Sequence, residues 1–410
     1  MDIGIKGFIT KTPGMGGEIK RDPEDFYVEE IMELKFGEGE YGIIKVKKKN
    51  WDTLKFVKQL AKILGISQKR ISFAGTKDKR AVTVQYFSIK GVKPENITKI
   101  SIKEAKISFL GFSPKEIKLG DLLGNFFVIR VHNAKNGEIF SKTKEELEEL
   151  GVPNFFGSQR FGTRAITHEV GKLILQRNFE EAFWTYVAKP SEIEEENVNK
   201  IRRELWEKRD AIFGLKELPK HLNYERTLLQ KLREGKSEKE ALQSLPKTLK
   251  MMFTHAYQSY LFNRLLSQRI SDFGTLKETI NDDYVCFLTF KTKKPSFAGF
   301  GKVGENKARV EFLLKKGFAT LALPLIGYDT KLEGWNKIAE EFLSEDGLCI
   351  SSFKTEEKDF ASSGSWRSAE IPIHITSLIF KGGTFEFYLP AGSYGTVFLR
   401  EFLKTQEKTL

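Results

Sequence analysis

The order of apolar and polar residues predicts strands near the start of the chain, helices in the middle and a mixed closing segment. Apolar residues alternate with acids from Phe26 to Ile31, and a second alternating run covers residues 41–47, so both runs predict half-buried strands. Asp52 precedes a helical pattern and Gly65 follows it, which predicts a capped helix. Its expected apolar face consists of Leu54, Val57, Leu60, Ala61 and Leu64.

The middle of the chain has a helical period. Predicted helices cover residues 169–177, 180–187, 192–207, 224–234, 238–245 and 251–270. Residues 271–365 then mix strands with basic turns, and we identify no catalytic pattern among them. The chain closes with a predicted strand at 385–389, a turn at 390–392 and a helix from Thr396.

A charged loop separates two short runs of strand-forming residues. The runs cover 71–73 and 81–89, and the sequence between them includes Gly-Thr-Lys-Asp-Lys-Arg. Asp78 is the only acid of the loop, and the cations beside it favour its ionised form, which suits a nucleophile better than a proton donor. A Lys-Asp pair in a turn is also common as plain turn chemistry, so the loop alone leaves both interpretations open.

Composition indicates a class of partner. The chain has 410 residues, of which 40% are hydrophobic and 30% charged, which predicts a globular protein of two or three domains. Its formal charge of +12 favours a polyanionic partner such as nucleic acid, with a general solubility surface as the alternative. Because neither a signal peptide nor a membrane-spanning apolar run is evident, we expect a cytoplasmic protein.

The cysteines and histidines do not follow the spacing of a disulfide framework or a metal site. Cys286 and Cys349 each lie in an apolar stretch, which predicts two small buried side chains in a reducing compartment. The five histidines are scattered along the chain without ligand spacing. We therefore expect no metal.

The charged loop belongs to one of five motifs that resemble the TruD family of tRNA pseudouridine synthases. Residues 73–85, Phe-Ala-Gly-Thr-Lys-Asp-Lys-Arg-Ala-Val-Thr-Val-Gln, resemble the family signature Ala-Gly-x-Lys-Asp-x-x-Ala-Val-Thr-x-Gln. The Asp of this signature is the catalytic residue of the family, so the resemblance implies that Asp78 is catalytic. Lys77 precedes it in the signature, and we expect Lys77 to contact the substrate.

Two shorter motifs add three site residues. The sequence Lys-Arg-Asp-Pro-Glu-Asp-Phe resembles the family motif Lys-x-x-Pro-Glu-Asp-Phe, whose lysine, here Lys20, lies near the catalytic carboxylate. Gly-Asn-Phe-Phe resembles Gly-Asn-x-Phe, in which the Asn lies beside the catalytic Asp and the Phe stacks on the target base. The resemblance thus implies catalytic roles for Lys20 and Asn125 and base stacking for Phe127. Strand alternation places Phe126 in the core.

The fourth motif mixes aromatic residues, glycines and polar side chains. Residues 153–162 resemble Pro-Asn-Tyr/Phe-Phe-Gly-x-Gln-Arg-Phe-Gly. Because glycines permit close approach of an RNA strand and aromatic rings stack on bases, we expect Phe156, Gln159 and Arg160 to bind substrate. Either Arg160 or Lys20 is expected to pair with the catalytic carboxylate.

The fifth motif lies near the end of the chain. Residues 385–401 resemble Phe-x-Leu-Pro-x-Gly-x-Tyr/Phe-Ala-Thr followed by Arg-Glu, with Gly395 in place of the commoner Ala. Arg400 is the Arg of this motif, and we expect it to contact the substrate. The same run is predicted to turn from a strand into the last helix.

The resemblance implies an α+β fold. Residues 1–165 and 366–410 would form a discontinuous pseudouridine synthase catalytic domain with a bent antiparallel sheet, interrupted by a large α+β TRUD insertion domain at 166–365. It implies an isomerase that converts uridine to pseudouridine at uridine 13 of tRNA without a cofactor. We expect a monomer, and we expect the insertion to bind tRNA.

Several alternatives remain at this point. An acylal and a glycal intermediate are both compatible with one catalytic carboxylate. A glycosidase would need two opposed carboxylates, whereas the loop supplies one. An RNA-binding protein without catalysis would keep the charge and the aromatic residues, but the combination of Lys20, Asp78, Asn125 and Phe127 argues against it. The basic run 47–49 fits either a phosphate contact or a solvated surface.

Overall fold

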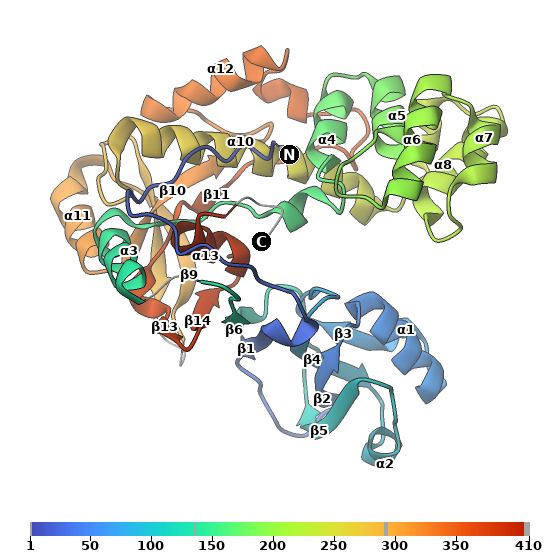
Figure 1. Ribbon diagram of the computed structural model, residues 1–410, viewed down its shortest axis with the longest axis horizontal. Coiled ribbons are helices and arrows are strands. Elements are labelled where there is room, and N and C mark those ends of the chain that lie inside the picture. The colour runs from blue at the N-terminus through green and yellow to red at the C-terminus, as the bar shows by residue number, and fades with distance from the viewer. Residues whose placement is uncertain (1, 135–136, 291–293, 406–410) are drawn as a thin grey trace.

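A computed structural model describes residues 2–134, 137–290 and 294–405, and it has the predicted mixed α+β architecture. The larger of its sheets has eight strands in the order β13-β14-β6-β1-β4-β2-β5, with β3 paired to β4 (Figure 1). Of these pairs, β1 with β4 is parallel and the others are antiparallel. The strands are β1 (Phe26–Met32), β2 (Tyr41–Lys49), β3 (Ile71–Phe73), β4 (Val82–Lys90), β5 (Ala105–Ser113), β6 (Leu122–Arg130), β13 (Ile379–Lys381) and β14 (Thr384–Pro390).

Helix α1 (Thr53–Leu64) begins and ends where the sequence predicts. The Asp52 carboxylate accepts the backbone N–H of Lys55 at 2.9 Å, and Gly65 closes the helix with φ of 65°. The apolar face is rotated from the prediction, because Leu54 is 59% exposed while Phe56 is fully buried. The buried positions have the i, i+3, i+4 spacing of one face, and this face packs on the sheet.

A four-stranded sheet and a two-stranded pair form the second β region. The four strands follow the order β11-β10-β8-β9. They are β8 (Tyr284–Thr289), β9 (Ser296–Lys302), β10 (Ala319–Leu325) and β11 (Ser365–Ser368), and the separate pair is β7 (Val152–Pro153) with β12 (Glu370–Ile371). The pair joins residues that lie on the two sides of the predicted insertion. The other helices outside the helical block are α2 (Pro94–Thr98), α3 (Gly137–Leu150), α11 (Lys307–Lys315), α12 (Ile338–Glu345) and α13 (Gly395–Leu403).

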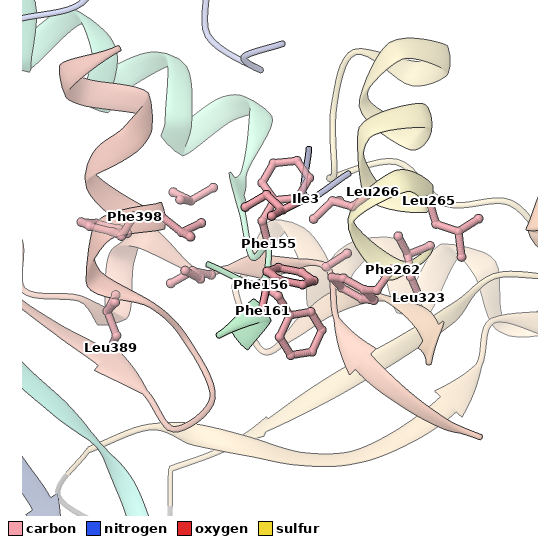
Figure 2. Packing of buried hydrophobic residues seen from close by; sticks show 14 of the residues in the cluster. Ile3, Phe155, Phe156, Phe161, Phe262, Leu265, Leu266, Leu323, Leu389 and Phe398 are labelled. Atoms are coloured by element: carbon pink, nitrogen blue, oxygen red, sulfur yellow. The ribbon is translucent and has the colours of Figure 1, made fainter. Parts of the chain in front are cut away.

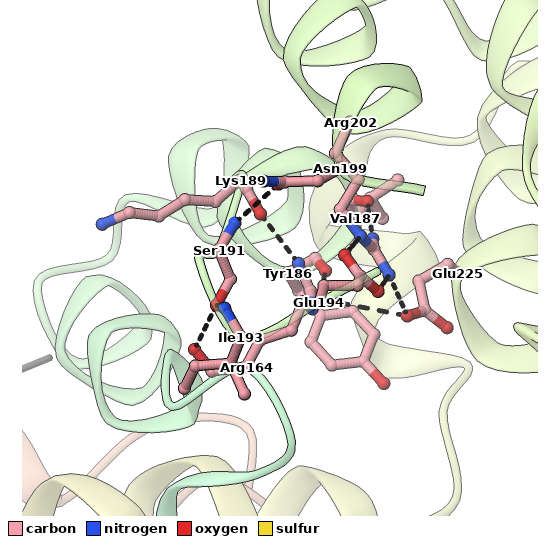
Figure 3. Close-up of polar contacts among 10 residues, drawn as sticks. All are labelled: Arg164, Tyr186, Val187, Lys189, Ser191, Ile193, Glu194, Asn199, Arg202 and Glu225. Carbon is pink, nitrogen blue, oxygen red and sulfur yellow. Dashed lines mark hydrogen bonds and ion pairs between the residues drawn. The ribbon is translucent and has the colours of Figure 1, made fainter. Parts of the chain in front are cut away.

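The helical block agrees with the predicted helices. It contains α4 (Thr167–Leu175), α5 (Phe179–Ala188), α6 (Glu196–Lys208), α7 (Ala211–Glu217), α8 (Asn223–Arg233), α9 (Glu238–Gln243) and the long α10 (Lys247–Phe273). The sequence placed the start of α6 four residues early and did not predict α7. Inside the block Arg202 is fully buried and donates to Glu194, to Glu225 at 3.2 Å and to the Val187 carbonyl at 2.5 Å (Figure 3). Because every one of these acceptors is a carboxylate or a carbonyl, the buried guanidinium is satisfied.

The largest hydrophobic cluster joins segments that are far apart in the sequence. Phe155, Phe156 and Phe161 meet Phe262, Leu265 and Leu266 of α10 and Leu389 and Phe398 near the end of the chain (Figure 2). The eight-stranded sheet is built from residues 26–130 and 379–390, which lie outside the predicted insertion at 166–365. The core is not split in this way, because residues on both sides of the predicted borders at 165 and 366 share it. The domain borders themselves stay predictions.

Three sequence-based assignments differ from the structure. Both cysteines were predicted to be buried; Cys286 is, but Cys349 is exposed at the start of the 3-10 turn Ile350–Phe353. Phe127 is buried and Phe126 is only half-buried, so the face assigned to the core was wrong. In the basic run, Lys48 is 1% exposed, and it therefore fits neither a phosphate contact nor a solvated surface.

The described residues form neither a membrane-spanning helix nor a metal-binding cluster. No helix in residues 2–134, 137–290 and 294–405 is long and apolar enough to cross a membrane. The same residues contain no group of three or more His, Cys, Asp or Glu side chains that could hold a metal ion.

Candidate active site

The charged loop leaves the sheet at a break in strand pairing. Residues 82–84 of β4 pair with β1, and residues 87–89 pair with β3 along the same edge. The loop connects β3 back to the start of β4, so it lies over the junction between β1 and β3. At this junction the backbone N–H of Tyr86 is not paired with a strand, and Glu30 Oε2 accepts it at 3.0 Å. The free backbone donor at this edge of β4 thus has a hydrogen-bond acceptor, although neither β1 nor β3 reaches it.

A buried polar network supports the loop from below. Glu30, which is 1% exposed, accepts from Lys77 Nζ at 2.7 Å and from Gln85 Nε2 at 3.3 Å. Gln85 Nε2 also donates to the Gly75 carbonyl at 2.9 Å, and Thr53 Oγ1 donates to Gln85 Oε1 at 3.0 Å. The backbone N–H of Lys77 in turn donates to Thr53 Oγ1 at 3.0 Å. These contacts tie the loop to β1, to β4 and to the first residue of α1.

Lys20 lies next to the loop because the turn that follows it is held in place by hydrogen bonds. The 3-10 turn Pro23–Asp25 precedes β1, and Asp25 accepts the Asp22 N–H at 2.9 Å and lies 2.8 Å from His132 Nε2. Arg80 of the loop donates to the Arg21 carbonyl at 2.7 Å, which joins the two segments directly. Lys20 itself has φ of 59°, a left-handed conformation that only its surroundings can impose.

Asp78 lies between a cation and an amide donor. Lys20 Nζ is 3.6 Å from Asp78 Oδ2, and Gln159 Nε2 donates to the same oxygen at 2.5 Å. The side chains of Lys20 and Asp78 are 21% and 30% exposed, so the pair faces open space and not the core. Of the two cations that the sequence offered as partners for Asp78, the structure therefore places Lys20 beside it.

A cavity of about 220 Å³ opens beside Asp78. Its walls come from β1, the charged loop, β6, the segment around Gln159 and the turn between β14 and α13. The lining residues are Phe26, Val28, Gly75, Thr76, Lys77, Asp78, Leu122, Asn125, Phe127, Gln159, Gly392, Ser393, Tyr394, Gly395 and Thr396. All five sequence motifs thus contribute to one cavity, although they span the length of the chain.

Phe127 lines this cavity but is held by other rings. It stacks on Phe387 with ring centroids 5.2 Å apart and meets Phe26 edge-on at 6.2 Å. A Cβ atom at Gly395 would lie 2.9 Å from the Phe127 ring, which explains why glycine at this position permits the observed packing. Only 6% of Phe127 is exposed, so stacking on a base stays a prediction that the ring packing does not favour.

Besides Lys20, three predicted residues lie outside the cavity lining. Phe156 is packed in the core, with the Arg367 guanidinium 4.0 Å from its ring centroid. Arg160 Nε donates to Ser259 Oγ on α10 at 3.0 Å. Arg400 donates to the Gly7 carbonyl and to Glu401, and its guanidinium lies over the Phe8 ring. Their described contacts join the motifs to α10 and to the N-terminal segment.

Several residues of this site were not predicted from the sequence. Ser393, Tyr394 and Thr396 line the cavity, and all three lie inside the fifth motif, where their types alone gave no reason to select them. Glu30 was not selected from the sequence, yet it is the centre of the network below the loop. The available signal for Glu30 was its even spacing from Phe26 and Val28, which puts it on the buried face.

The arrangement suits chemistry that uses one carboxylate. Asp78 is the one acid among the described lining residues, and Glu30 beneath it is fully engaged. A single ionised carboxylate beside a cation can act as a nucleophile or as an electrostatic partner for a developing positive charge. A pair of opposed acids, which a glycosidase requires, is not formed by the residues that line the cavity.

Two larger cavities, of about 700 Å³ and 560 Å³, lie along the N-terminal segment, and another of about 470 Å³, between residues 36–39 and β5, has no predicted site residue in its lining. Among the predicted site residues, only Arg400 lines either of the first two. The smaller of these two includes Arg164, Lys189 and Lys404 in its walls. We therefore take the cavity at Asp78 as the candidate active site. It is smaller than the other cavities, but all five motifs contribute residues to its lining.

Comparison with known proteins identifies the family. The sequence model of the family described as tRNA pseudouridine synthase D (TruD) matches residues 2–402. The chain is 65% identical to the probable tRNA pseudouridine synthase D of Archaeoglobus fulgidus, with 98% of both chains covered, and 38% identical to that of Pyrococcus abyssi, with 97% and 98% covered. The crystal structure of the putative tRNA pseudouridine synthase D from Methanosarcina mazei covers 100% of this chain and 98% of its own, with a TM-score of 0.80 and 37% identity. With the motifs gathered at one cavity and the match extending over nearly the whole chain, this protein belongs to the tRNA pseudouridine synthase D (TruD) family.

Proposed function

We propose that this protein converts uridine to pseudouridine in tRNA, at uridine 13, with Asp78 as the catalytic residue. One observation supports the chemistry above all: Asp78 is the acid on the wall of the cavity where the five motifs meet, and Lys20 and Gln159 both approach its Oδ2 atom. Membership of the family supports the substrate class. The position in the tRNA rests on the resemblance described for the sequence.

The reaction moves one glycosidic bond. The bond from C1′ to N1 of uracil breaks, the base turns, and a bond from C1′ to C5 forms; C5 loses a proton and N1 gains one. Asp78 assists the first step either by bonding to C1′, which gives an acylal, or by taking a proton from C2′, which gives a glycal. In both cases Lys20 and Gln159 hold the carboxylate in place while the ribose approaches.

The cavity has to receive a base that has left its stack. At about 220 Å³ it has room for a single pyrimidine nucleoside and not for a duplex. Enzymes that act on a base in RNA extrude the nucleotide into such a pocket. The net charge of +12 supports binding of the rest of the tRNA through its phosphates, so affinity should fall as salt rises, with a log-log slope of ~0.7 to 0.9 per phosphate neutralised.

Pseudouridine mapping on unmodified tRNA transcripts tests this proposal. The wild-type protein should form pseudouridine at uridine 13. Asp78→Asn, which keeps the size of the side chain, should give no product above background while binding the transcript within a few fold of wild type. Asp282→Asn is a matched control, since it removes an aspartate that pairs on the surface with Lys302. Product from Asp78→Asn at a rate near that of wild type would reject the catalytic assignment, and product at another uridine would reject the position.

A further inference from the structure

Two buried polar atoms on the wall of the candidate cavity have no hydrogen-bond partner among the described residues. They are Oδ1 of Asn125 and Oγ of Ser393. Ser393 is only 8% exposed, so its hydroxyl is not simply solvated at the surface. Buried polar atoms are nearly always paired in folded proteins, and two unpaired ones in a single cavity point to a ligand that pairs with them.

The protein around Asn125 does not supply that partner. Asn125 lies on β6 between Glu30 of β1 and Leu389 of β14. Both carboxylate oxygens of Glu30 are already engaged by Lys77, Gln85 and the Tyr86 N–H, and Leu389 is apolar. A partner for the Asn125 carboxamide therefore has to come from the cavity side.

The carboxamide presents a hydrogen-bond acceptor and a donor side by side, and no contact to either is found in the part of the chain that the structure describes. The imide edge of uracil is the complement, because it carries the N3–H donor between two carbonyl acceptors, at C2 and C4. A serine hydroxyl can donate to either carbonyl. The cavity also contains Asp78, so a uracil held by its imide edge would lie in the same pocket as the carboxylate.

Building on the proposed function, we propose that Asn125 Oδ1 accepts the N3–H of the target uracil and that Ser393 Oγ donates to a flanking carbonyl. This contact has a consequence for the turn of the base. A half-turn about the axis from N3 to C6 exchanges N1 with C5 and C2 with C4, while N3–H stays on the axis. The N3–H bond to Asn125 can thus persist while the base is detached from the ribose. After the turn, the same imide edge faces the same two side chains.

Asn125 and Asp78 have different roles in this arrangement. Asp78 acts on the ribose, whereas Asn125 and Ser393 retain the free base and present C5 to C1′. Loss of the base contacts should slow the step in which the base turns and should leave the tRNA phosphate contacts intact. The effect should therefore appear in the single-turnover rate more than in the affinity for the transcript.

The test crosses enzyme variants with altered bases. Transcripts carry uridine, N3-methyluridine or 4-thiouridine at the uridine that the wild-type protein modifies, and single-turnover rates and binding are measured. The N3-methyl group removes the donor, and 4-thiouridine weakens the C4 acceptor. Wild type should lose ~100-fold or more on N3-methyluridine, because a site built around a hydrogen bond rejects a substrate that lacks it. Asn125→Ala should be slower on uridine by ~10-fold or more but should lose less than ~10-fold further on N3-methyluridine.

Wild type should be slower on 4-thiouridine than on uridine, because the hydrogen bond from Ser393 to C4 is weakened. Ser393→Ala should remove this penalty and keep the penalty for N3-methyluridine. Asn154→Ala is the matched control, because the Asn154 carboxamide is buried and already bonded to Ser368 and Arg367. It should lose stability with no change in the discrimination between bases. If Asn125→Ala does not fold, Asn125→Ser supplies the same comparison with a shorter side chain that lacks the carboxamide.

The outcomes are distinguishable. A full N3-methyl penalty in both Asn125 variants, or wild-type turnover of N3-methyluridine at the uridine rate, would overturn this inference and leave the proposed function standing. A wild-type protein that forms no pseudouridine on any unmodified transcript would overturn both.

Discussion

Lys20 Nζ lies 3.6 Å from Asp78 Oδ2, although 57 residues of sequence separate the two side chains. Lys20 adopts a left-handed backbone conformation to reach this place, and its ammonium group also lies 4.4 Å from the centroid of the Phe26 ring. The Phe26 ring is itself in contact with Phe127. The position of the cation is therefore fixed by the same packing that forms the wall of the cavity.

Replacing Lys20 should slow the chemical step. Lys20→Met keeps the length of the side chain but removes the charge beside Asp78, so we expect kcat to fall about 5-fold, which corresponds to the about 1 kcal/mol of a partly exposed ion pair. The Kd for the tRNA transcript should change little, because only one unit of a net charge of +12 is lost. Lys20→Arg restores the charge and should recover part of the rate. Equal rates for Lys20→Met and wild type would show that the cation has no part in the reaction.

The buried pair of Lys77 and Glu30 should behave as a structural unit. Their side chains are 9% and 0% exposed, and the Nζ to Oε1 distance is 2.7 Å. Glu30→Gln alone leaves a buried ammonium without its counter-ion, which typically costs about 3–5 kcal/mol in the free energy of unfolding. Lys77→Met alone should cost a similar amount for the opposite reason. Urea unfolding of each variant measures these values.

The double variant Glu30→Gln/Lys77→Met is the control for this pair. With both charges removed it should be more stable than either single variant, since neither charge remains buried alone. Additive losses in the double variant would contradict a direct interaction. The loop should also lose order in the single variants, which hydrogen exchange at residues 75–78 can detect.

The sequence predicted elements well where local signals agree. Asp52 and Gly65 bound α1 as expected, because capping depends on residues within one helical turn. The paired runs on the two sides of the charged loop became β3 and β4. The buried face of α1 was predicted less accurately than its ends. Leu54 and Phe56 are both apolar, and only the position of the sheet decides which of them is buried.

The residues of the site were predicted only in part, because their roles depend on contacts between distant segments. Motifs name residues, but they do not say whether a residue contacts a substrate or another motif. Arg160 and Arg400 illustrate this, because their described partners are Ser259 of α10 and the N-terminal segment. These contacts are between residues about 100 and 390 positions apart, a separation that no local pattern reports. Glu30 was not predicted as a site residue, because the sequence alone does not distinguish a buried, paired acid from an exposed one.

The two cysteines should differ sharply in reactivity. Burial raises the pKa of the Cys286 thiol to about 12, whereas the hydroxyl groups of Ser351 and Ser352 lower the pKa of the exposed Cys349 thiol to about 7. Since the thiolate is the reactive form, one thiol per chain should react with a disulfide reagent at pH 8 in the native protein, and two after unfolding. Cys349→Ser should abolish the native reaction without changing activity, because Cys349 does not line the cavity at Asp78. A native count of zero or two would contradict the structure.

The buried Lys48 should make stability depend on pH at the alkaline end. Its ammonium group donates to Thr83 Oγ1 at 2.9 Å and to the Trp51 carbonyl at 3.0 Å, and burial lowers its pKa from 10.5 to about 8. Below pH 8 the charged form is buried and destabilises the fold; between pH 8 and 10.5 the folded state is neutral while the unfolded state still binds the proton. The free energy of unfolding of wild type should therefore rise with pH across this window, relative to Lys48→Met, by about 3 kcal/mol. Lys47→Met, on the exposed face of the same strand, controls for the loss of one positive charge. If the wild-type and Lys48→Met curves stay parallel from pH 7 to 10.5, the ammonium group of Lys48 is not buried in solution as it is here.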